Sequence, residues 1–183
     1  MDWYDRLNEY FPEEEMKHPG QMRDLIEDKD AYHKKETEDY ILMYGEFSSF
    51  IFVDYLLVSA HTRGKGTGTK VLRYLKQKGK PILLEVEPID EHNEDTRKRV
   101  RFYEKNGFIK ADQIVYQRET DDGDVLDMDI YYWSPENISQ EEVMKKMATA
   151  CEEIHNFRSK KYYGRIKADP EEVLEMKKTR AAS

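Results

Sequence analysis

The 183-residue sequence contains one cysteine, Cys151, so an internal disulfide is excluded. A single cysteine fits a reducing compartment, and we expect a cytoplasmic protein in which this thiol is buried as an apolar group. No apolar run approaches the roughly 18 residues needed to span a bilayer. The acidic N-terminal stretch MDWYDRLNEYFPEEE also lacks the apolar centre of a secretory signal. These absences predict a protein without a membrane partner.

The chain has fewer basic than acidic residues: 30 Lys and Arg against 38 Asp and Glu, which gives a net charge of −8. Such a chain is not expected to bind nucleic acid. The five histidines are scattered without metal-ligand spacing, so no metal site is predicted. Acids are themselves missing from Tyr55 to Leu84, a stretch that carries seven Lys and Arg. This local gap in an acidic chain predicts an anion-binding site.

Hydrophobic periodicity and turn residues divide the rest of the chain into alternating strands and helices. The N-terminal region reads as helical pieces over residues 12–30, interrupted at Pro19-Gly20. The C-terminal region reads as an amphipathic helix over 139–158 and a short helix that Pro170 opens. Between them we expect strands at 40–47 and 50–58, a helix at 69–79, a strand at 81–87, a helix at 94–106, and strands at 108–119 and 125–133.

This order places antiparallel hairpins on both sides of one βαβ-like unit. The fold class is therefore predicted as α+β, with a mixed, mostly antiparallel twisted sheet flanked by helices. We expect a domain over residues 1–135 and a helical extension over 136–183 that packs on it. The extension's helix has Val143, Met147, Ile154 and Phe157 on its inner face. That helix is also a candidate surface for a partner or a homodimer.

The stretch HTRGKGTGTK, residues 61–70, is the candidate anion site, because glycines precede the start of a helix. A Walker A loop requires glycine before its lysine, but Thr69 precedes Lys70. The dinucleotide fingerprint requires its third glycine one residue later than Gly68, although Glu85 stands about 20 residues on, as that fingerprint requires. Hairpins on both sides also argue against a dinucleotide domain.

Two motifs resemble those of the GNAT superfamily of N-acetyltransferases. Residues 63–68, RGKGTG, fill its Arg/Gln-x-x-Gly-x-Gly/Ala motif, and Leu56 and Val58 precede it as the end of the family's fourth strand does. Residues 101–108, RFYEKNGF, resemble the family's second signature. The resemblance covers about residues 40–133. It implies the acyl-CoA N-acyltransferase fold and acyl transfer from acetyl-CoA to an amine.

The resemblance also implies roles for the matched positions. Main-chain groups of Leu57 and Val58 would bind the pantetheine arm of acetyl-CoA. The motif and its neighbours would hold the pyrophosphate, with charge from Arg63; these positions are Arg63, Gly64, Lys65, Gly66, Thr67, Gly68 and Thr69. Many relatives have an asparagine seven residues before the signature tyrosine, where Thr96 stands here. Thr96 would either contact the cofactor arm or cap the helix.

Catalysis requires an acid for the thiolate and a base for the protonated amine. Tyr103 matches the tyrosine that acts as general acid in many GNAT proteins. Asp54, Glu85 and Glu87 are the candidate bases, because acids within apolar strands are unusual unless they are paired or used. Glu87 is slightly favoured, since it stands near the strand end where the cleft should open.

The sequence thus predicts an acetyl-CoA-dependent N-acetyltransferase acting on a small-molecule or protein amine. The alternative is a non-catalytic acyl-CoA-binding or interaction module with the same fold, and a nicotinamide-dependent enzyme is a weaker third option. Acids around the cleft would favour a cationic acceptor such as a polyamine or aminoglycoside.

Overall fold

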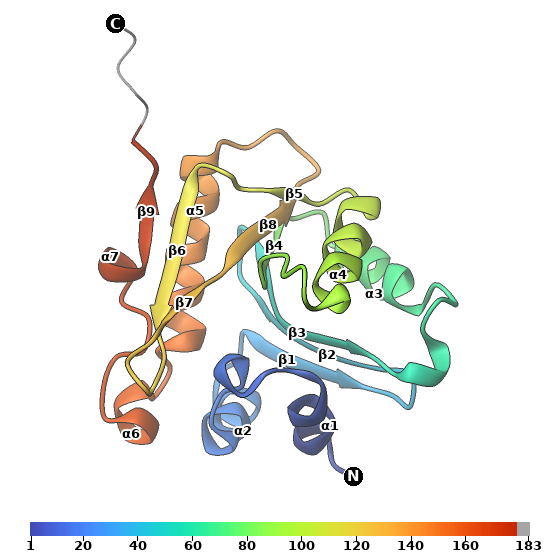
Figure 1. The fold of residues 1–183 in the computed structure, drawn as a ribbon, viewed down its shortest axis with the longest axis horizontal. Coiled ribbons are helices and arrows are strands. Elements are labelled where there is room, and N and C mark those ends of the chain that lie inside the picture. The colour runs from blue at the N-terminus through green and yellow to red at the C-terminus, as the bar shows by residue number, and fades with distance from the viewer. Residues whose placement is uncertain (179–183) are drawn as a thin grey trace, which may run out of the picture.

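The computed structural model describes residues 1–178 as two sheets with helices packed around them (Figure 1). The larger sheet has six strands in the order β1-β2-β3-β4-β8-β5, and only β3 and β4 pair in parallel. The smaller sheet has the order β7-β6-β9. The strands are β1 (Tyr32–Glu36), β2 (Tyr40–Glu46), β3 (Ile51–Val58), β4 (Ile82–Val86), β5 (Ile109–Lys110), β6 (Ile114–Glu119), β7 (Val125–Asp127), β8 (Asp129–Trp133) and β9 (Leu174–Met176).

Helices cover both faces of the larger sheet (Figure 1). The α3 and α4 helices bury Val71, Leu72, Leu75 and Val100 against one face. On the other face α1, α2 and α5 contribute Leu7, Leu25 and Met147 to a second apolar cluster. The helices are α1 (Trp3–Tyr10), α2 (Pro19–Asp28), α3 (Thr67–Lys76), α4 (Glu94–Lys105), α5 (Gln140–Ala150), α6 (Ser159–Tyr163) and α7 (Pro170–Val173). Within the described range, no helix is long and apolar enough to cross a membrane.

The central feature of the larger sheet is the place where β3 and β4 part. Their parallel pairing covers only Ile51–Val53 against Ile82–Leu84. A β-bulge follows in β3, since Tyr44 pairs with Val53 and Met43 pairs with Tyr55, which leaves Asp54 as the extra residue. Bulges bend a strand and increase its twist. β3 therefore continues along β2 to Val58 while its β4 side opens.

The predicted α+β class with a mixed, mostly antiparallel sheet is confirmed. The two strands predicted at 108–119 and 125–133 are each divided in the structure. β5 and β8 belong to the larger sheet, whereas β6 and β7 form a separate hairpin in the smaller one. The helix α2 begins at Pro19, which occupies a first-turn position where its missing N–H costs nothing.

The segment after residue 136 packs against the rest of the chain. Val143, Met147 and Ile154 of its predicted inner face are buried in the same apolar cluster as α1 and α2. The predicted 139–158 helix changes into a π-helical turn over Cys151–His155. The segment also adds a strand, β9, to the smaller sheet. Residues 179–183 of the predicted extension lie outside the described residues.

Candidate active site

The glycine stretch connects β3 to α3 through a short 3-10 turn, η2 (Ala60–Thr62). Gly64 and Gly66 adopt φ values of +80° and +82°, which side chains disfavour. Gly66 is the N-cap residue of α3, and no side chain caps this end of the helix. The first N–H groups of α3, at Thr67, Gly68 and Thr69, therefore face outward at the positive end of the helix dipole. This geometry suits a bound anion.

Gly68 is required for a different reason, because α3 and α4 approach closely there. A Cβ atom at Gly68 would lie 2.7 Å from Cζ of Phe102. Real Cβ atoms essentially never approach that closely, so a larger residue would displace the Phe102 ring or shift the start of α3. Gly68 thus lets the start of α3 pack directly against Phe102 of α4.

A cleft of about 370 Å³ lies between the end of β3, the start of α3 and one face of α4. Apolar side chains and cations both line it, as expected for a ligand with a flexible arm and an anionic end. The α1 helix closes one side through Tyr10. The lining residues are Tyr10, Leu56, Val58, Thr62, Arg63, Gly64, Gly66, Thr67, Gly68, Thr69, Asp95, Lys98, Arg99, Phe102, Tyr103 and Lys105.

Two arginines hold Tyr10 at the edge of this cleft. Arg63 stacks its guanidinium 5.0 Å from the centre of the Tyr10 ring, and its Nε donates to the Val58 carbonyl at 3.1 Å. Arg99 lies 5.3 Å from the same ring centre and donates from Nη2 to the Tyr10 hydroxyl at 3.2 Å. With Lys98 and Lys105, four cations and one acid, Asp95, line the cleft. The excess of positive charge favours an anionic ligand.

Tyr103 lines the cleft from α4 and is almost entirely buried. Burial raises the pKa of its phenol to about 12, although Arg99 acts in the opposite direction. Among the described residues no side chain or carbonyl is hydrogen-bonded to the Tyr103 hydroxyl, which leaves its proton available. At neutral pH this group is a protonated phenol that can donate a hydrogen bond or a proton to a negative charge that develops beside it.

Two comparisons with known proteins agree on the family. A family model described as "Acetyltransferase (GNAT) domain" matches residues 29–110. The chain is 48% identical over 178 residues to YjbC of Bacillus subtilis (strain 168), which is named as an acetyltransferase, with 96% of this chain and 93% of that protein covered. The chain belongs to the GNAT superfamily of N-acetyltransferases.

The fold of this N-acetyltransferase is also found among solved structures. A GNAT-family protein of Bacteroides thetaiotaomicron, named as an acetyltransferase, superposes with a TM-score of 0.65 at 23% identity. The match covers 86% of this chain and 88% of that one. At this identity the likeness supports the fold alone.

Several residues predicted to bind the cofactor lie away from the cleft of this N-acetyltransferase. The Leu57 side chain lies in the opposite core from Leu56, and its main chain pairs with Ile41 of β2. Lys65 does not line the cleft, and its N–H is bonded to the Thr62 carbonyl at 3.2 Å. An amide already bonded within its own turn is a poor candidate for the anion site.

Thr96 lies in the first turn of α4, and the residue that caps this helix is Asn93 rather than Thr96. It is buried, and its hydroxyl donates toward the carbonyls of Asn93 and Asp90 and accepts from the Asp90 N–H. These bonds brace the loop before α4 and leave Thr96 outside the cleft lining. The hydroxyl of Thr96 is thus used within this loop, and its contact with the cofactor arm stays a prediction.

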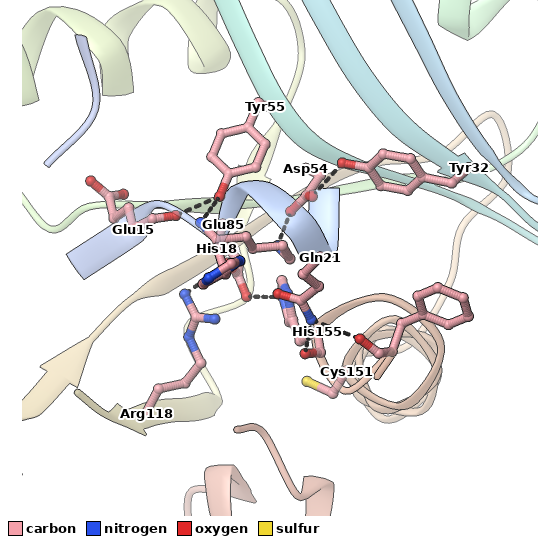
Figure 2. A network of polar contacts seen from close by, with 12 residues as sticks. Glu15, His18, Gln21, Tyr32, Asp54, Tyr55, Glu85, Arg118, Cys151 and His155 are labelled. Atoms are coloured by element: carbon pink, nitrogen blue, oxygen red, sulfur yellow. Dashed lines mark hydrogen bonds and ion pairs between the residues drawn. The ribbon is translucent and has the colours of Figure 1, made fainter. Parts of the chain in front are cut away.

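Asp54 was a candidate base, but the bulge directs it into a buried ion pair. Its Oδ1 lies 2.6 Å from Lys17 Nζ, and its Oδ2 accepts from the Tyr32 hydroxyl at 2.6 Å (Figure 2). The side chains of Asp54 and Lys17 are only 3% and 9% exposed. Both carboxylate oxygens of Asp54 have close partners. Asp54 therefore connects the segment just before α2, which contains Lys17, to the larger sheet.

Replacing Asp54 by asparagine should lower the free energy of unfolding by about 3 kcal/mol, because Lys17 would keep a buried charge without a counterion. Urea unfolding measures this change. Asp39→Asn is the matched control, since the Asp39–His61 pair is 54% and 62% exposed and should contribute less than about 1 kcal/mol. Equal stabilities for the two variants would contradict the structural role of Asp54.

Glu85, the second candidate base, is also part of a buried network of ion pairs (Figure 2). Its Oε1 lies 3.0 Å from Nε2 of His155, and its Oε2 lies 3.6 Å from the Arg118 guanidinium. Burial alone would raise the pKa of the Glu85 carboxyl, but Arg118 and His155 outweigh it and hold the pKa well below its usual range. A carboxylate this weakly basic is a poor proton acceptor.

Glu87, the third candidate, follows β4 and is the most accessible of the three, with a side chain that is 30% exposed. Its Oε2 lies 3.6 Å from Nη1 of Arg99, which is itself a cleft residue. Glu87 therefore lies next to a cleft residue without lining the cleft itself.

Sequence reasoning missed Tyr10, Lys98 and Lys105 as cleft residues. Tyr10 is brought there by an N-terminal helix whose position depends on long-range packing. Lys98 and Lys105 stand seven residues apart on α4, close to the two-turn spacing that places residues on one helix face, so this spacing could have indicated them.

Cys151 is buried as expected, and burial raises the pKa of its thiol to about 12. Among residues 1–178 no three His, Cys, Asp or Glu side chains are grouped to hold a metal ion.

Proposed function

We propose that this protein is an acetyl-CoA-dependent N-acetyltransferase that transfers the acetyl group directly to an amine of a small molecule or a protein. The observation that carries the proposal is one continuous cleft joining the uncapped start of α3 to the protonated phenol of Tyr103. The start of α3 would fit the pyrophosphate of coenzyme A, and the part of the cleft beside Tyr103 would fit the reacting thioester.

The residues at the α3 end would bind the cofactor through charge and main-chain amides. The N–H groups from Gly66 to Thr69 would donate to the pyrophosphate, with Gly64 allowing close approach and Arg63 adding a charge-assisted bond. The pantetheine arm would run along the end of β3, beside Val58, on the side that β4 has left. Lys98 and Lys105 would face the cofactor's remaining negative charge.

The chemistry would occur where the arm ends, beside Tyr103. The amine nitrogen attacks the thioester carbon, and the bond from carbon to sulfur then breaks. Tyr103, whose pKa of about 12 keeps it protonated, would give a proton to the departing thiolate. Glu87 stands on the acceptor side of this point and would attract a cationic amine such as a polyamine or aminoglycoside.

A panel of amines tests this function with the purified chain. Spermidine, kanamycin, a lysine-containing peptide and a peptide with a free N-terminus are each mixed with acetyl-CoA, and free thiol is measured. Acetyl-CoA-dependent thiol release that needs an amine, with a mass gain of 42 Da on that amine, is expected. Tight acetyl-CoA binding without thiol release across a broad panel would instead favour a non-catalytic acyl-CoA-binding module.

A further inference from the structure

Tyr10 is the last residue of α1, and its ring takes part in the cleft. Among the described residues it is the only one before β3 that lines this cleft. Neither of the two GNAT motifs in the chain includes it, because both lie downstream of β3. A role for Tyr10 therefore has to follow from its contacts.

The α1 helix is attached next to the end of β3, where the glycine stretch begins. The Arg6 guanidinium donates to the Thr37 carbonyl at 3.1 Å and to the Ser59 hydroxyl at 3.0 Å. Ser59 is the first residue after β3. On the inner side of the helix, Leu7 is fully buried in the apolar cluster. These contacts fix the position of Tyr10 relative to the glycine stretch.

The direction of the Arg63 side chain depends on two contacts. Its Nε donates to the Val58 carbonyl at 3.1 Å, and its guanidinium lies over the Tyr10 ring, 5.0 Å from the ring centre. Arg63 is exposed, and within residues 1–178 no carboxylate pairs with it. A guanidinium over an aromatic ring can still donate from its edges to an anion. The ring of Tyr10, rather than a counterion, thus helps to direct this cation.

Tyr10 is itself held from a second side of the cleft. Nη2 of Arg99 donates to the Tyr10 hydroxyl at 3.2 Å, and Nη1 of Arg99 lies 3.6 Å from Oε2 of Glu87. Phe11 meets the Tyr10 ring edge-on, with 4.9 Å between ring centres, and meets Tyr55 of β3 in the same way at 5.3 Å. The ring that Arg63 contacts is therefore anchored to α4 and to the larger sheet.

We propose that Tyr10 is a positioning residue for cofactor binding, whose ring orients the Arg63 guanidinium toward the pyrophosphate of acetyl-CoA before the cofactor binds. This inference rests on the proposed function and adds α1 to its cofactor site. Arg63 would contact the pyrophosphate, whereas Tyr10 acts through Arg63. The physical basis is entropic, because a long side chain that is already restricted loses less freedom on binding.

A double-mutant cycle on the Kd for acetyl-CoA, measured by calorimetry, tests this inference. Arg63→Ala should raise the Kd about 10-fold, the lower end for loss of a charge-assisted bond. Tyr10→Ala should raise it about fivefold, since Arg63 must then be ordered on binding. The double variant should stay within about twofold of Arg63→Ala, because the ring has no guanidinium left to orient.

Three further variants separate orientation of Arg63 from packing of α1. Tyr10→Phe keeps the ring and should keep the Kd within about twofold of the wild type. Tyr10→Leu keeps an apolar side chain beside Phe11 but lacks the ring, so the Kd should rise as it does for Tyr10→Ala. Glu9→Ala changes an exposed neighbour on the same helix and should leave the Kd unchanged.

The outcomes distinguish this inference from the function on which it rests. Wild-type affinity in both Tyr10→Ala and Tyr10→Leu would overturn the inference and leave the N-acetyltransferase function standing. Additive losses in the double variant would also overturn it, because Tyr10 would then act independently of Arg63. A wild-type chain that does not bind acetyl-CoA would overturn both.

Discussion

Replacing Tyr103 by phenylalanine should lower kcat for acetyl transfer by roughly 100-fold, the lower end of what a positioned general acid contributes. The phenol is buried at the inner end of the cleft, and its pKa of about 12 keeps it protonated until a thiolate forms. Phenylalanine keeps the ring but removes the proton donor. Because no part of the chain within residues 1–178 bonds to this hydroxyl, the variant should lose little stability.

Steady-state thiol release and acetyl-CoA titration separate the two effects. The rate should fall while the Kd for acetyl-CoA changes by less than about threefold. Tyr74→Phe is the matched control, because Tyr74 is 36% exposed on α3 and does not line the cleft. A Tyr103→Phe chain that turns over at the wild-type rate would remove the acid role from this residue.

Replacing Gly66 by aspartate should weaken acetyl-CoA binding by roughly 100-fold, which corresponds to about 2.7 kcal/mol. Gly66 caps α3 with φ at +82° and nothing lies within 4 Å of the position of a new Cβ, so the carboxylate would project into the proposed phosphate site. Two like charges about 4 Å apart near a protein surface repel by about 4 kcal/mol. Binding to the folded state raises Tm, so acetyl-CoA should stabilise the wild type and leave this variant almost unchanged.

Gly79→Asp is the matched control for Gly66→Asp, because it adds the same side chain away from the proposed phosphate site. Gly79 follows the other end of α3, has φ at +73° and likewise has nothing within 4 Å of a new Cβ. The two variants therefore share the same backbone strain and the same added charge. Gly79→Asp should keep the full rise in Tm with acetyl-CoA. Equal loss of the rise in both variants would show that strain, and not the phosphate site, explains the result.

The centre of the fold was predictable because its signals are local. The apolar runs of β2, β3 and β4, and the glycines that begin α3 and end α4, each specify an element from neighbouring residues. β1 was missed because YHKKE is a polar edge strand, and its partner β2 rather than its own pattern determines it. β9 was missed for the same reason, since it forms only by pairing with β6.

The acceptor side was harder to predict than the cofactor side. The cofactor loop is one continuous segment, so its glycine spacing reveals it. The roles of Asp54 and Glu85 depend on partners far away in the chain. Asp54 is paired by Lys17, and Glu85 by His155, which lies 70 residues later. The β-bulge at Asp54 also breaks the alternation on which a sequence-based assignment of strand faces relies.

The most direct test of the central claim is a calorimetric titration of acetyl-CoA into the wild-type chain at pH 7. The cleft geometry predicts one site per chain, with a Kd between about 1 μM and 1 mM, the usual range of KM values for enzyme substrates. Binding of acetyl-CoA at this stoichiometry would support the cleft as the cofactor site. A titration without binding heat at several temperatures, with no rise in Tm at millimolar acetyl-CoA, would contradict it.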